Sequence, residues 1–217
     1  MRTFFAWLQK EDLIPDNPLL HIKKPKIQKK VIEALKPEEI KALLGQFNSK
    51  DFNSVRNRLI IMMLLDTGMR VSELNNLMIH DVDIQRGSIL IRHGKGNKQR
   101  LVRIGSKTQK ALWMYMSLYR RGDSQRLFTD AGGRPLKVNA IKLLMYKLGK
   151  RANLEGVHAH RLRHTFAISF LRAGGDVFSL QYLLGHSTLA MTQRYLQSLN
   201  ADDAFKAHKR FSPMDNL

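Results

Sequence analysis

The chain has 217 residues, 43% of them hydrophobic, which suits one globular domain with a short appendage and excludes a disordered chain. It has no cysteine, which excludes disulfides, thiolate metal sites and cysteine catalysis and makes a reducing cytoplasm the expected compartment. The net charge of +19 predicts a polyanionic partner, because residues 84–201 carry 21 lysines and arginines against four acids. No apolar run is long enough to cross a bilayer, so no membrane partner is expected.

A short amphipathic helix is the first predicted element. Apolar residues from Phe4 onward recur at helical spacing, and the helix should stop before Pro15, because the residue before a proline disfavours helical backbone. Residues 21–30 contain five lysines and one proline, a composition typical of an extended basic linker.

A central buried helix is predicted at residues 53–66, which are apolar nearly all round, and Gly68 should end it. An earlier helix should begin at Pro37, since proline fits the first turn and the two acids that follow complement the helix dipole. Apolar spacing predicts further helices at residues 106–121, 138–152, 160–172, 177–184 and 188–197.

A small sheet is predicted between these helices. The β-branched runs 88–92 and 99–104 are separated by glycines and should form a hairpin, to which residues 81–84 add a third strand. The predicted fold class is therefore mainly α with a small antiparallel β-sheet (α+β).

Side chains suited to phosphodiester chemistry recur along this domain. Guanidinium groups bind phosphate in bidentate fashion, imidazole donates to a phosphate oxygen or moves a proton near neutral pH, and a phenol can act as a nucleophile. The candidates, in chain order, are Arg70, Lys95, His160, Arg163, His186 and Tyr195. Together they predict a site for one scissile phosphodiester.

The order Arg, Lys, His-x-x-Arg, His and then Tyr closely resembles the pattern of the tyrosine recombinase (phage integrase) family, which includes the Xer-type resolvases. The step of nine residues from His186 to Tyr195 also matches that family. The resemblance covers nearly the whole chain and implies the family's catalytic-domain fold. It further implies site-specific breakage and rejoining of double-stranded DNA without a metal, and self-association into a tetrameric synapse on DNA.

The resemblance also implies a role for each candidate. Tyr195 attacks the phosphodiester to give a 3′-phosphotyrosyl intermediate, and His160 accepts its proton. Arg70 and Arg163 stabilise the added negative charge, and His186 donates a hydrogen bond to the same phosphate. No cofactor and no small-molecule ligand are implied, because the covalent link conserves the bond energy.

The lysine that protonates the leaving 5′-oxygen is assigned to Lys95 rather than Lys98. Glycines on both sides of Lys95 let the loop approach a phosphate closely, and the lysine of the family aligns with this position. The remaining cations near the site are expected to contact DNA: Lys98, Arg100, Arg103 and Arg161.

Two overlapping segments fit His-x-x-Arg, and His160–Arg163 is preferred to His158–Arg161 because His164 and small apolar residues follow it. Glu73 is expected to orient Arg70, and His164 to pack next to the catalytic side chains without taking part in the reaction itself. The three histidines of this segment lack a carboxylate or cysteine at metalloprotease spacing, so no metal site is predicted.

Three segments are predicted along the chain. Residues 1–32 are interpreted as the last helix of a truncated core-binding domain with its basic linker, or else as an arm packed on the catalytic domain. Residues 33–200 form the catalytic domain. Residues 201–217 are a tail whose helix carries an apolar stripe, which either packs on its own domain or, as we prefer, docks on a neighbouring protomer.

Two other functions share part of this pattern. A type IB topoisomerase has nearly the same site chemistry, and a non-catalytic DNA-binding protein would use the same cations only to hold phosphates. The predicted hairpin, the short length and the Leu-Leu-Gly-His-Ser string at residues 183–187 favour the recombinase.

Overall fold

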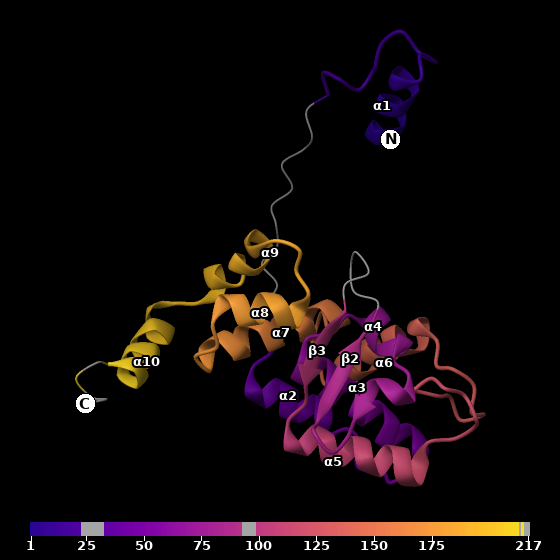
Figure 1. The fold of residues 1–217 in the computed structure, drawn as a ribbon, viewed down its shortest axis with the longest axis vertical. Helices are drawn as coiled ribbons and strands as arrows, with labels where there is room; N and C mark the ends of the chain where they lie inside the picture. Colours follow the sequence, from indigo (N-terminus) through magenta and orange to yellow (C-terminus); the bar gives the residue numbers. More distant parts are fainter. Residues whose placement is uncertain (23–32, 93–98, 213, 215–217) are drawn as a thin grey trace. The chain divides into compact units, whose positions relative to one another are not determined.

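A computed structural model describes residues 1–22, 33–92, 99–212 and 214 (Figure 1). The chain divides into two compact units, Met1–Val31 and Ile32–Leu217. The first contributes the predicted amphipathic helix, α1 (Arg2–Lys10), which has no buried residue and exposes about half of Phe4 and Trp7. That this unit is the end of a core-binding domain stays a prediction.

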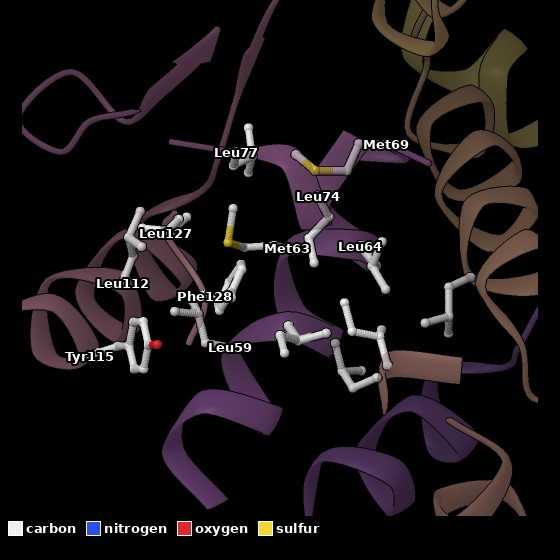
Figure 2. Packing of buried hydrophobic residues seen from close by; sticks show 14 of the residues in the cluster. Leu59, Met63, Leu64, Met69, Leu74, Leu77, Leu112, Tyr115, Leu127 and Phe128 are labelled. Carbon is white, nitrogen blue, oxygen red and sulfur yellow. The ribbon is translucent and has the colours of Figure 1, made fainter. Parts of the chain in front are cut away.

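The core of the second unit is built around α3 (Phe52–Thr67). Because its sequence is apolar nearly all round, most of its surface is covered: α7 (Ala159–Arg172) and α5 (Ser106–Met114) pack against it most extensively. Figure 2 shows its buried side chains among those of neighbouring elements, and five of them have no exposed surface: Leu59, Ile60, Ile61, Met63 and Leu64. The prediction of a central buried helix is confirmed.

Gly68 ends α3 in the left-handed conformation, with φ of 61°. A Cβ at this position would lie 2.3 Å from the ring of Phe166 on α7, so glycine also permits the close approach of the two helices. Arg70 follows two residues later. The αL turn therefore places a cation where the core meets the surface.

The remaining elements agree largely with the predicted spacing. The helices are α2 (Pro37–Leu44), α4 (Val71–Asn76), α6 (Val138–Arg151), α8 (Val177–Leu184), α9 (Leu189–Gln193) and α10 (Ala201–Phe211), with 3-10 turns η1 (Ile79–Asp81) and η3 (Leu196–Ser198). Two predicted helices differ: α5 continues as a π-helical turn, η2 (Tyr115–Tyr119), and the helix expected at 188–197 is broken into α9 and η3. Among the described residues, no helix is long and apolar enough to cross a membrane.

The sheet has three antiparallel strands in the order β1 (Val82–Asp83), β2 (Ser88–Ile91) and β3 (Arg100–Arg103). Ile91 pairs with Arg100 and Ser88 with Arg103, so the predicted hairpin and third strand are confirmed. Burial alternates along β3, and Arg100 faces inward with Val102. This inward arginine meets the end of α8, which lies against β3 (Figure 1).

Candidate active site

The Glu73 carboxylate joins two arginines. Its Oε2 accepts the Arg70 backbone N–H at 2.7 Å, which caps α4, and its Oε1 accepts the Arg70 guanidinium at 2.8 Å. From β3, Arg100 donates Nη1 to Oε1 at 3.0 Å and Nη2 to Oε2 at 2.7 Å. Burial alone would raise the pKa of Glu73, but the hydrogen bonds from Arg100 and Arg70 outweigh burial and hold this pKa below its ordinary value.

Arg163 hydrogen-bonds to two backbone segments, one just before Arg70 and the other just before His186. It donates Nη1 to the carbonyl of Gly68 at 2.8 Å and Nη2 to the carbonyl of Leu184 at 2.7 Å. Burial, and next the charge of Arg70, lower the pKa of Arg163 to about 10, so the guanidinium is still charged at neutral pH. Two cations held near each other in this way form an anion site.

His186 and Tyr195 lie with their rings parallel, 6.1 Å apart between centroids and 3° between planes. His186 follows Gly185, which ends α8 in the left-handed conformation, and its Nδ1 is 2.9 Å from Oγ1 of Thr192. Burial, then the charges of Arg163 and Arg70, lower the pKa of His186 to about 4. The imidazole is therefore neutral at pH 7. In the tautomer whose Nδ1 accepts from the Thr192 hydroxyl, Nε2 carries the ring hydrogen and can donate it elsewhere.

Tyr195 is buried, with 7% of its surface exposed, and lies in the turn between α9 and η3 instead of inside a helix as expected. The ring of His164 also lies next to that of Tyr195, with ring centroids 5.3 Å apart. The Nε2 of His164 is buried and has no hydrogen-bond partner among the described residues, and burial lowers the pKa of this histidine. His164 thus contacts the candidate nucleophile directly.

His160 lies exposed in the first turn of α7. Its charge acts on both His164 and His186, which places it within electrostatic range of the ring cluster. His158 is the N-cap of α7, accepting the Arg161 backbone N–H on Nδ1 at 3.2 Å, which gives this histidine a local structural role.

One of the expected DNA contacts, that of Arg100, is corrected. Arg100 has a side chain that is only 4% exposed, and its donors are used by Glu73 and the Leu183 carbonyl. Arg161 donates to the carbonyls of Glu33 and Glu155, at 3.0 and 2.5 Å. All three guanidinium nitrogens of Arg100 are paired within the domain, so this side chain is not available to a phosphate. Arg161 keeps further N–H groups beyond these two contacts, and its contact with DNA stays a prediction.

Arg103, by contrast, is exposed on the outer face of β3. Lys95 and Lys98 lie outside the described residues. Within the described part of the chain, no group of three or more histidine, aspartate or glutamate side chains is arranged to hold a metal ion.

His186 should give a measurable pH dependence. We expect its imidazole to titrate near pH 4 in the free protein, where burial and the charges of three arginines oppose its protonation. Because the unfolded chain takes up the same proton near 6.5, the free energy of unfolding should fall as the pH is lowered from 6.5 toward 4. An NMR titration of the ring proton checks the first statement, and urea unfolding of the parent and of His186→Asn checks the second. A midpoint near 6.5 would contradict both.

Residues 33–202 match the Phage integrase family. The chain is 37% identical over 204 residues to tyrosine recombinase XerC of Bacillus pumilus, covering 90% of this chain and 67% of that protein. Among solved structures, XerA recombinase superposes with a TM-score of 0.72 at 36% identity, covering 89% of this chain and 69% of that one. XerH recombinase bound to its difH substrate gives 0.69 at 26% identity, covering 88% and 58%.

The chain therefore belongs to the phage integrase family. It is a tyrosine-type site-specific recombinase, an enzyme that breaks and rejoins DNA. It spans about two thirds of the length of the curated relatives that it matches. Neither the topoisomerase nor the non-catalytic alternative gains support from these relatives.

Proposed function

We propose that Tyr195 is the nucleophile of the recombination reaction. Its phenol oxygen attacks phosphorus, the bond to the 5′-oxygen breaks, and the protein remains joined to the 3′-phosphate. The parallel packing of Tyr195 against His186, 6.1 Å away, is the observation that carries this assignment. A phenol holds its proton until about pH 10, so the step needs a base, and we assign that role to His160.

Arg70 and Arg163 stabilise the negative charge that builds up on the non-bridging oxygens, and His186 donates Nε2–H to the same phosphate. Their preorganised positions support this role, because fixed donors in a partly dry site cost no reorganisation during reaction. Glu73 orients Arg70 through the contacts described above, and His164 packs behind Tyr195.

Lys95 protonates the departing 5′-oxygen. A 5′-hydroxyl of a partner strand then attacks the phosphotyrosine and releases Tyr195, so the number of phosphodiester bonds is conserved and no cofactor is consumed. The cationic side chains take the place that a metal ion has in other phosphoryl-transfer sites.

The partner is double-stranded DNA, which the net charge of +19 and the DNA complex of XerH support. Arg103 and Lys98 contact its backbone, and such contacts make binding weaken steeply with added salt. A DNA substrate would place the protein at the nucleoid.

Covalent trapping tests this function. The substrates are duplexes that carry a nick within a randomised segment. When the protein cleaves close to the nick, the short strand between the two breaks is released and cannot attack the phosphotyrosine, so the protein stays attached to the DNA. We expect adducts that resist detergent and form equally well in excess EDTA, with the attached peptide mapping to Tyr195. Attachment at any other residue, or loss of adduct in EDTA, would contradict the proposal.

Three further assignments divide the chain into segments. We assign residues 1–32 to the end of a core-binding domain with its linker, and 33–200 to the catalytic domain. Residues 201–217 form a tail that docks on a neighbouring protomer within a tetrameric synapse. The exposed apolar stripe of α10 supports the last assignment.

A further inference from the structure

The guanidinium of Arg100 is enclosed between β3, α4 and the end of α8. Two of its nitrogens bind Glu73, and its Nε donates to the carbonyl of Leu183 at 2.8 Å. With the side chain 4% exposed, Arg100 is among the most deeply buried cations in the described residues. A buried arginine is tolerated when its donors are paired, and here they are paired across two elements.

The end of α8 is shaped to receive this guanidinium. Gly185 has φ of 63°, and a Cβ there would lie 2.8 Å from Nη1 of Arg100. The last carbonyls of a helix lack partners within the helix, and Arg100 takes the carbonyl of Leu183 while Arg163 takes that of Leu184. His186 therefore lies two residues after Leu184, at the end of a helix whose last two carbonyls are held by buried arginines.

We propose that Arg100 is a positioning residue of the recombination reaction. It fixes Arg70 through the shared Glu73 carboxylate and fixes His186 through the Leu183 carbonyl, so that both groups meet one phosphate. This inference rests on the proposed function of Arg70 and His186. It replaces the DNA-backbone contact expected from the sequence.

The planar fork of arginine is essential to this role. Its Nη1 and Nη2 match the two carboxylate oxygens while Nε points to a third acceptor, a geometry that the single ammonium of lysine cannot reproduce. Arg100→Lys keeps the charge and most of the aliphatic stem. It should therefore preserve the fold while loosening the link between α4 and α8.

The test uses the nicked duplexes that the parent chain converts to adducts. At saturating protein, we expect Arg100→Lys to slow single-turnover adduct formation on the order of 100-fold, the cost of small misplacements in an active site. The dissociation constant for DNA and its dependence on salt should stay within about twofold of the parent, since no phosphate contact is lost. Arg134→Lys, which changes an arginine that is 82% exposed, is the matched control and should react at the parent rate.

A second variant makes the result independent of folding. Glu73→Gln weakens the same connection from its acidic end, because it removes the charge and replaces one acceptor oxygen with an NH2 group. Arg100→Lys should cost far less in that background than in the parent, because both changes act on one connection. The fraction of each variant that is folded is measured at the assay temperature, so that a slow reaction is not mistaken for loss of the fold.

The inference is overturned if the Arg100→Lys protein is folded and reacts at the parent rate. If Arg100→Lys does not fold, the same result for folded Glu73→Gln overturns it. A salt slope reduced by about one would also overturn it, since that marks a lost phosphate contact. The inference is also overturned if the rate losses of Arg100→Lys and Glu73→Gln are additive in the double variant. If the parent itself forms no adduct, the proposed function fails instead, so the two failures are distinguishable.

Discussion

Tyr195→Phe is expected to abolish covalent adduct formation, lowering the rate by at least about 10⁴-fold, the scale seen when a nucleophile is removed. The substitution deletes only the attacking oxygen. The ring can keep its contacts with His164 and His186, so the fold should be unchanged. The measurement is detergent-resistant adduct on the nicked duplexes after long incubation.

The same variant separates catalysis from binding. Its affinity for the duplexes should match the parent, because a phenol contributes no charge to phosphate recognition. Tyr146→Phe is the matched control: this tyrosine lies on α6, is 65% exposed and should leave adduct formation unchanged. A Tyr195→Phe protein that still forms adducts would assign the nucleophile elsewhere.

The sequence predicted the helices well where burial alone decides them. Residues 53–66 are apolar nearly all round, and only a helix covered over most of its surface buries such a segment, which α3 is. Glycine was also a reliable sign of where a helix ends. Gly68 and Gly185, which directly follow α3 and α8, both have positive φ, a conformation that glycine adopts easily at the end of a helix.

The segment around Tyr195 was predicted less well. Its apolar spacing suggested one helix at residues 188–197, but the chain turns after Gln193 and tightens into η3. Packing of the Tyr195 ring beside His164 and His186 is a tertiary contact, which periodicity within one segment cannot reveal. Helix α4, with six residues, is too short to show a period at all.

Arg100 was the misassigned cation, and the sequence held a signal that identifies it. Arg100, Val102 and Ile104 alternate with Leu101 and Arg103, so a strand here places Arg100 on the same face as two buried apolar residues. Charge alone suggested a DNA contact, whereas the alternation indicates burial. What could not be predicted was its partner, because Glu73 lies 27 residues away along the chain.

The tail presents an apolar surface that its own domain leaves uncovered. Helix α10 lies within the predicted tail, and its two phenylalanines are exposed, Phe205 by 70% and Phe211 by 57%. Its attachment to the end of α7 is mainly polar: Arg172 pairs with Asp203 at 3.1 Å, and Arg210 donates to the Ala173 carbonyl. The edge of the Phe211 ring also approaches Gly174, so Phe205 is the more exposed of the two rings. These contacts orient the helix and leave the apolar stripe available to a second protomer.

Deleting residues from Ala201 onward should therefore abolish higher-order complexes on paired DNA sites while leaving the domain folded. The free energy of unfolding should change by no more than about 1 kcal/mol, because a half-exposed ion pair contributes little. Native gels and light scattering of protein–DNA complexes measure assembly. Phe205→Ser should reproduce the deletion, whereas Lys206→Ser, next to it but on the polar side of α10, should assemble like the parent. If the truncated chain unfolds, or assembles as well as the parent, the tail is a structural part of its own domain, because a helix that docks only in trans contributes to assembly and not to folding.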